Sequence, residues 1–176
     1  VDHHGRITGV EALLRWQHPE RGMVSPGDFI PLLESNELIN DVGEWVLEDA
    51  CYQLARWAQH PQLRKLTISV NISPLQFRDE HFLARVEGVF ARTQAPLQRL
   101  KLEVTESLFV EARDDARDKM LALKARGVRF SLDDFGTGNC RWISLKSTNH
   151  LCSRCSKAKQ TRRLSRVPLP WQRALI

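Results

Sequence analysis

The amino-acid sequence predicts an α/β fold with parallel strands, built as part of a TIM-like (β/α) barrel. Strand and helix patterns alternate along residues 6–133, and the helices are long enough to cross from one strand to the next. Each predicted strand also carries an oxygen-bearing side chain at or near its C-terminal end. In a barrel these ends share one face, whereas in an open sheet they lie along an edge, so their convergence favours the barrel.

The first half of this pattern contains one strand and two helices. Residues 6–16 form a mainly apolar run that predicts a strand, interrupted by Glu11. A carboxylate there is costly to bury unless it is paired or bound to a metal. Ser25 and Pro26 have the residue types of a helix N-cap and first helical position, and a longer helix is predicted over residues 38–59 by its apolar periodicity.

The second half predicts three further strands separated by helices. Prolines and glycines mark the breaks between these elements, and Gly127 ends the last helix. Met120, Leu121 and Leu123 are expected to face inward from that helix. The predicted strands cover residues 66–72, 100–105 and the stretch that ends at Asp133 and Asp134, and the predicted helices cover residues 79–92 and 114–126.

Composition is that of an ordinary globular domain. The 176 residues are long enough for one sizeable core, with 42% hydrophobic and 27% charged residues. No apolar run approaches the roughly 18–20 residues that span a bilayer. The sequence has no signal-peptide pattern, and Val1 is not an initiator methionine, so we expect a fragment.

Charge divides the chain sharply near residue 139. All 21 acidic residues precede Asn139, whereas nine of the 26 Lys and Arg residues follow it. Residues 1–138 therefore carry 17 basic and 21 acidic residues, a net charge of −4, and residues 139–176 carry +9. Three of the four cysteines also lie in the basic part, at Cys140, Cys152 and Cys155. The two parts need separate explanations.

Two interpretations remain open for the acidic residues. Asp133 and Asp134 repel each other at close range unless a cation lies between them, so they form either a divalent-metal site or a solvated acidic turn before Gly136 and Gly138. Glu11 is either a metal ligand or a buried ion-pair partner of Arg15. Repetition of oxygen-bearing side chains at four strand ends, at Glu11, Asn71, Glu103 and Asp133–Asp134, favours a metal site.

At this point the sequence resembles a known family. The segment EALLRW at residues 11–16 is similar to the signature that names the EAL domains, bacterial cyclic di-GMP phosphodiesterases. NIS at 71–73, EVTE at 103–106 and DDFGTG at 133–138 resemble later motifs of that family, in the same order. Each motif is short, but together, over residues 7–138, they are highly specific.

The resemblance implies a barrel that binds two Mg²⁺ or Mn²⁺ ions and hydrolyses cyclic di-GMP to linear pGpG. It implies catalytic roles for Glu11, Asp133 and Asp134, and it implies substrate contacts for Leu13 and Arg15. Glu106 would hold the loop after the paired aspartates in place. The metal ligands carried over from the family are Glu11, Asn71, Glu103, Asp133 and Asp134. Oxygen ligands suit Mg²⁺ or Mn²⁺ better than zinc.

The resemblance stops after Gly138. The family's later lysine, glutamate and glutamine strands are not recognisable, so we predict a partial EAL domain over residues 1–138 and an unrelated, irregular, largely disordered tail over 139–176. Four of the family's eight strands are recognisable, and we expect poor stability or aggregation because of the open sheet edge.

Codons for residues 146–151 can be chosen so that a shifted frame reads Ile-Asp-Gln-Ser-Phe, a pentapeptide common in the family. Our hypothesis is that the tail is a frameshifted translation.

Two functional hypotheses follow. The first is an EAL-type phosphodiesterase that is inactive as this truncated chain, and the second is a degenerate module that binds cyclic di-GMP or a protein partner without catalysis. The resemblance implies a homodimer in intact relatives, and a location in the cytoplasm or in the cytoplasmic part of a larger membrane-bound sensor.

The basic part of the chain offers two weaker candidates. His150, Cys152 and Cys155 are a weaker candidate for zinc, and the basic residues between Lys157 and Arg173 are weak evidence for nucleic-acid binding.

Overall fold

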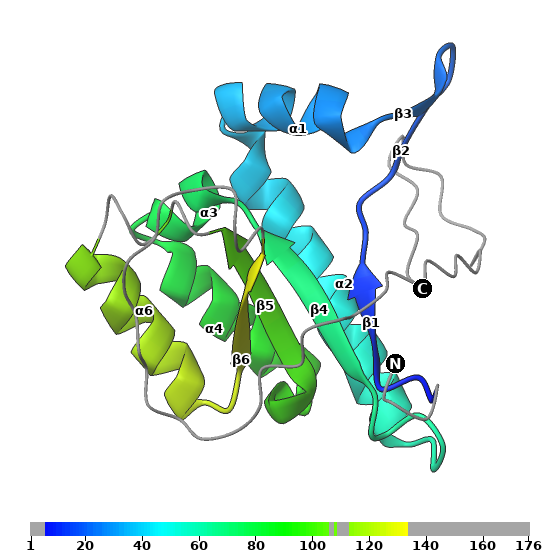
Figure 1. Ribbon diagram of the computed structural model, residues 1–176, viewed down its shortest axis with the longest axis vertical. Helices are drawn as coiled ribbons and strands as arrows, with labels where there is room; N and C mark the ends of the chain where they lie inside the picture. Colours follow the sequence, from blue (N-terminus) through cyan, green and yellow to red (C-terminus); the bar gives the residue numbers. More distant parts are fainter. Residues whose placement is uncertain (1–5, 106–107, 109–112, 134–176) are drawn as a thin grey trace.

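Four parallel strands form the central sheet of the protein, shown in Figure 1 as a computed structural model of which we describe residues 6–105, 108 and 113–133. The strands pair in the order in which they occur along the chain, which is the neighbour relation of a (β/α) barrel. This order confirms the predicted parallel α/β arrangement. The strands are β1 (Gly9–Ala12), β4 (Thr67–Ile72), β5 (Leu100–Thr105) and β6 (Arg129–Asp133).

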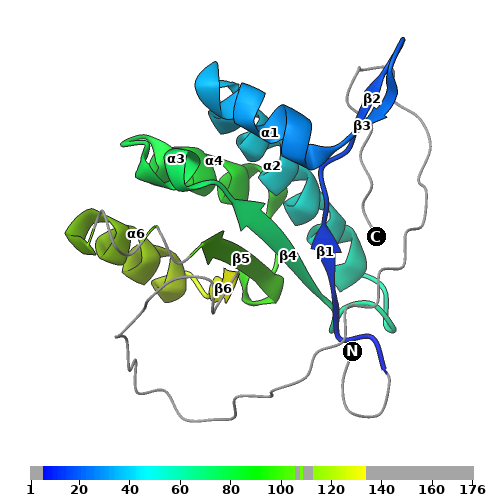
Figure 2. The same ribbon diagram turned by 45° about the horizontal axis from the view of Figure 1, so that its top comes forward.

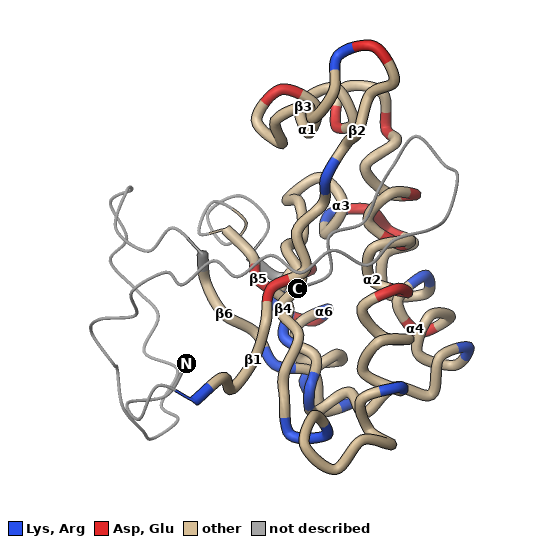
Figure 3. Tube along the Cα trace, turned by 90° about the vertical axis from the view of Figure 1, so that its right-hand side faces the viewer, with Lys and Arg blue, Asp and Glu red and all other residues tan. Residues whose placement is uncertain are grey.

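The main helices lie on one side of the sheet. Figure 2 shows α2, α4 and α6 together on that side, as expected for helices that connect parallel strands. Figure 3 shows acidic positions along α2 next to basic positions of α4, and Arg92 Nε pairs with Glu48 Oε1 at 2.8 Å. The helices are α1 (Pro26–Ser35), α2 (Leu38–Ala58), α3 (Pro74–Arg78), α4 (Phe82–Thr93) and α6 (Arg113–Ala125), with a 3₁₀ turn at Leu97–Arg99.

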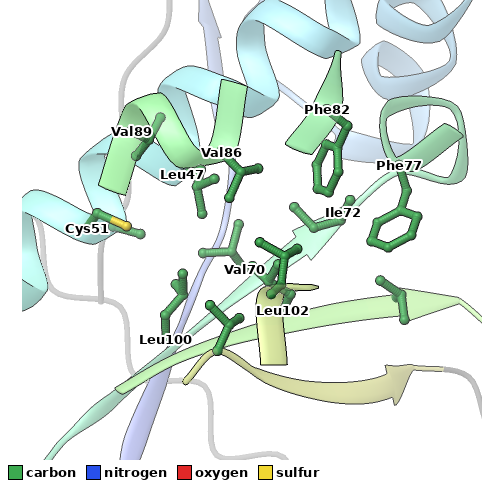
Figure 4. Packing of buried hydrophobic residues seen from close by; sticks show 14 of the residues in the cluster. Leu47, Cys51, Val70, Ile72, Phe77, Phe82, Val86, Val89, Leu100 and Leu102 are labelled. Atoms are coloured by element: carbon green, nitrogen blue, oxygen red, sulfur yellow. The ribbon is translucent and has the colours of Figure 1, made fainter. Parts of the chain in front are cut away.

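The core lies between the sheet and these helices. Along β5, buried and half-buried residues alternate, because successive side chains of a strand point to opposite faces. Leu100 and Leu102 are fully buried, and Val104 is nearly so. Figure 4 shows Leu102 and Val70 of the sheet beneath Val86 and Leu47 of the helices. The opposite face of the sheet therefore carries the polar residues.

The predicted strand over residues 6–16 is wrong in its extent. Strand β1 ends at Ala12, and the chain then forms a separate antiparallel hairpin of β2 (Trp16–His18) and β3 (Gly22–Val24). Trp16 makes an edge-on ring contact with Phe29 of α1, with ring centroids 5.9 Å apart. Packing on α1 thus competes with continuation of the sheet, and a sequence pattern does not show this long-range contact.

Two expectations about the helices also need correction. Residues 73–79 contain the separate helix α3, where Ser73 Oγ accepts a hydrogen bond from the Leu75 amide at 3.2 Å, and α4 begins at Phe82 rather than at Asp79. In α6, Leu123 is fully buried, whereas Leu121 is 53% exposed and does not face inward. Helical spacing places Leu121 away from the side of α6 that packs on the core.

No helix in the described ranges combines the length and apolar character that a membrane span requires. Residues 134–176, and with them the predicted tail boundary, the zinc candidates and the basic segment, lie outside the described residues.

Replacing Leu102 by Ala is expected to lower the free energy of unfolding by about 2–5 kcal/mol, because the change leaves a cavity in a packed core. Leu121→Ala is the matched control, since the same atoms are removed from an exposed site and the expected change is within about 0.5 kcal/mol. Urea unfolding followed by circular dichroism measures both. Equal losses for the two variants would contradict the assignment of the core.

Candidate active site

Three of the predicted metal ligands, Glu11, Asn71 and Glu103, occupy one face of the sheet. The register pairs Asn71 with Glu103, and it pairs Glu11 with Ser69, two residues before Asn71 on the same strand. Because residues two apart on a strand share a face, these positions lie on the side opposite the helix-packed core. Glu11, Asn71 and Glu103 thus come from three consecutive strands of the sheet, as the sequence predicts.

Asn71 directly contacts the carboxylate of β1. Its Nδ2 donates a hydrogen bond to Glu11 Oε1 at 2.9 Å. The alternative pairing of Glu11 with Arg15 is not what the described residues show, because the Arg15 guanidinium Nη1 donates to the Leu14 carbonyl at 2.9 Å. Asn71 therefore orients Glu11 and lies in register beside Glu103.

Glu103 is held by two donors that the sequence analysis missed. Lys101 Nζ lies 2.8 Å from Glu103 Oε1, and Ser131 Oγ donates to the same oxygen at 3.2 Å. The Glu103 side chain is only 15% exposed, so these contacts act with limited screening by water. The alternation of β5 was the available signal, because it places residues 101 and 103 on the same face.

The paired aspartates are only partly covered by the structure. Asp133 ends β6, and its backbone is in register with Thr105 beyond the Glu103–Ser131 pair. This position is on the same side of the sheet as the other predicted ligands. The side chain of Asp133, and both Asp134 and Glu106, lie outside the described residues. Within the part that is described, no group of three His, Cys, Asp or Glu side chains forms a metal-binding cluster.

Leu13 and Arg15, the predicted substrate contacts, lie between β1 and β2 and are half-buried. They follow the C-terminal end of β1, so they are on the same edge of the sheet as Asn71 and Glu103. Their role toward a substrate stays a prediction.

Helix α3 begins two residues after the end of β4, the strand that carries Asn71. The helix is held by side chains from other helices. Ser73 Oγ donates to Glu34 Oε1 of α1 at 2.6 Å. Lys119 of α6 is buried, and its Nζ donates to the carbonyl oxygens of Phe77 at 3.1 Å and Asp79 at 2.9 Å. A cation at the C-terminal end of a helix satisfies carbonyls that lack a helical partner. These contacts fix the connection that begins three residues after Asn71.

This arrangement has a counterpart among known proteins. The model of a protein family described as the EAL domain matches residues 1–149. The chain belongs to the EAL domain family. The match covers the strands that carry Glu11, Asn71 and Glu103, so the resemblance predicted from the motifs is confirmed.

A curated relative is similar to the same part of the chain. The chain is 41% identical, over 143 residues, to the bifunctional diguanylate cyclase/cyclic di-GMP phosphodiesterase MucR of Pseudomonas aeruginosa. The aligned region covers 81% of this chain and 21% of the relative. The first curated relatives are all much longer, and the chain spans between 16% and 21% of their length.

Solved EAL structures confirm the fold. The PaMucR phosphodiesterase in complex with c-di-GMP is 42% identical with a TM-score of 0.73, over 78% of this chain and 55% of that one. The EAL enzyme Bd1971 in a form with cAMP and cyclic di-GMP bound is 32% identical with a TM-score of 0.68, over 76% and 37%. The described strands are therefore part of a TIM-like barrel, as predicted.

Lys119→Met is expected to lower the free energy of unfolding by about 1–3 kcal/mol, because it leaves the carbonyl groups of Phe77 and Asp79 at the C-terminal end of α3 without this donor. Lys124→Met on the exposed side of the same helix removes the same charge and serves as control. Guanidinium unfolding curves compare the two proteins. A loss no larger than that of the control would show that Lys119 does not hold α3.

Proposed function

We propose that this EAL domain binds cyclic di-GMP at the carboxyl ends of its strands and derives from a metal-dependent phosphodiesterase that yields linear pGpG. The observation that carries this proposal is the placement of Glu11, Asn71 and Glu103 on one face of three neighbouring strands. The relatives named as cyclic di-GMP phosphodiesterases, and the similar structures with that ligand bound, support the substrate class.

The donor set fits divalent cations that prefer oxygen. Glu11 and Glu103 offer carboxylates, and Asn71 uses its amide nitrogen on Glu11, which leaves its amide oxygen as the ligand atom. We propose that Asp133 and Asp134 complete the sites for two Mg²⁺ or Mn²⁺ ions. When bound, such ions supply a hydroxide nucleophile and neutralise charge on the phosphodiester.

The remaining residues orient these ligands and the substrate. Asn71 fixes the Glu11 carboxylate, and Ser131 ties Glu103 to the neighbouring strand. Held carboxylates lose less conformational entropy when they bind a ligand. Arg15 and Leu13 are proposed to contact cyclic di-GMP, and Glu106 is proposed to support the loop after Asp133.

We further propose that the 176-residue chain binds its ligands without turnover. After Gly138 we recognise no counterpart of the lysine-bearing strand that the family resemblance leads us to expect, and this part of the sequence contains no acidic residue. The second candidate function is therefore a binding module. A location in the cytoplasm or in the cytoplasmic part of a larger membrane-bound sensor, and a homodimer of the intact domain as the family resemblance implies, complete this proposal.

Manganese binding tests the site. Glu103→Gln is expected to raise the Kd for Mn²⁺ at least about tenfold, because a half-buried carboxylate ligand becomes neutral. Glu20→Gln, in the exposed hairpin turn, has the same change of charge and should leave the Kd unaltered. Isothermal titration calorimetry gives both values. If Glu20→Gln weakens binding as much as Glu103→Gln, the bound ion lies elsewhere.

Turnover is tested separately. The chain, incubated with cyclic di-GMP and Mn²⁺ and resolved by liquid chromatography, is expected to show bound cyclic di-GMP but no pGpG. A Glu11→Gln protein is the blank for contaminating phosphodiesterase. Formation of pGpG by the unaltered chain, and not by this variant, would refute the inactive state and establish an enzyme.

A further inference from the structure

Lys101 is a charged neighbour of the site that the proposed function does not use. It lies on β5, two residues before Glu103, and so on the same face of the sheet. Its Nζ is 2.8 Å from Glu103 Oε1, and the two side chains are 33% and 15% exposed. The register also pairs Lys101 with Arg129 of β6. Two basic residues therefore lie side by side on neighbouring strands, two positions before the Glu103–Ser131 pair.

This ion pair adds little to the architecture. Lys101 and Glu103 belong to the same strand, so a bond between them links no two elements of the fold. The link between strands is made by Ser131, whose hydroxyl on β6 donates to the same Glu103 oxygen at 3.2 Å. The effect that is specific to Lys101 is therefore the positive charge that it places against this oxygen.

That charge opposes a metal ion at the same atom. A divalent cation that coordinates Glu103 Oε1 must displace the ammonium group or remain near it, and two cations at short range repel. Screening by water is limited because Glu103 is mostly buried. Ser131, a neutral donor, has no comparable effect on a cation.

We propose that Lys101 is an internal competitor of the divalent metal for Glu103, and that it sets the metal affinity of the site. This inference rests on the proposed function, since it takes Glu103 to be a metal ligand. Lys101 acts through Glu103 and is a positioning residue, not a catalytic one. A chain in which residue 101 is uncharged binds the ion more tightly than the unaltered chain. A chain with arginine at this position keeps the positive charge and binds the ion as the unaltered chain does.

The test is the Kd for Mn²⁺ of the full chain, measured by isothermal titration calorimetry. Lys101→Met keeps the length and apolar stem of the side chain and removes the charge, so the Kd is expected to fall about tenfold. Lys101→Arg keeps the charge and is expected to bind as the unaltered chain does. Lys124→Met on the exposed side of α6 has the same change in net charge and is expected to leave the Kd unchanged.

The outcomes separate this inference from the proposed function. If the unaltered chain binds Mn²⁺ but Lys101→Met binds it equally or more weakly, the competition is refuted and the metal site stands. If Lys124→Met tightens binding to the same degree, net charge and not position is responsible, and the competition is again refuted. If neither the unaltered chain nor Lys101→Met binds Mn²⁺, the metal site and the competition both fall. Lys101→Gln repeats the comparison should the methionine variant lack the circular dichroism of the unaltered chain.

Discussion

The candidate site depends on which face of the sheet each residue of β5 occupies. Leu100, Leu102 and Val104 are buried against the helices, so hydrophobic burial fixes which side of this strand faces the core. A shift by one residue would move Glu103 into that core and Leu102 out of it. The placement of Glu103 beside Asn71 is therefore enforced by apolar contacts that involve neither residue, and the cost of moving Leu102 into water maintains it.

The connection after β4 shows how the remaining helices support this edge. Helix α3 has only five residues and cannot be stable by itself. It is held by Lys119 from α6 and by Glu34 from α1, which are remote from it in sequence. The site therefore rests on polar contacts from several helices as well as on the sheet, and the position of Asn71 is coupled to how α1 and α6 pack.

Sequence reasoning reached the strands, the main helices and the position of Glu11, Asn71 and Glu103 at or near the C-terminal ends of their strands, because periodicity and strand-end position depend on local sequence. It failed where a long-range contact decided the structure, and also where a local helix-start signal was overlooked. Trp16 leaves the sheet to pack on Phe29, and α3 forms after a Ser73-Pro74 pair that has the same helix-start signature as Ser25-Pro26. Lys119 pairs with Asp115 four residues earlier in α6, but its contact with α3 was missed because the acceptors there are backbone carbonyls about forty residues away, which no side-chain pattern records.

The contacts of the two carboxylates make the candidate site electrostatically asymmetric. Glu11 accepts from the neutral amide of Asn71, so its negative charge remains available to attract a cation. Glu103 shares its charge with the ammonium group of Lys101, and the same oxygen also accepts from Ser131. Since attraction of a divalent ion depends on the charge that its ligands retain, the β1 side of the face is the more attractive one. This difference arises within the sheet itself, because the partners Asn71, Lys101 and Ser131 are all strand residues.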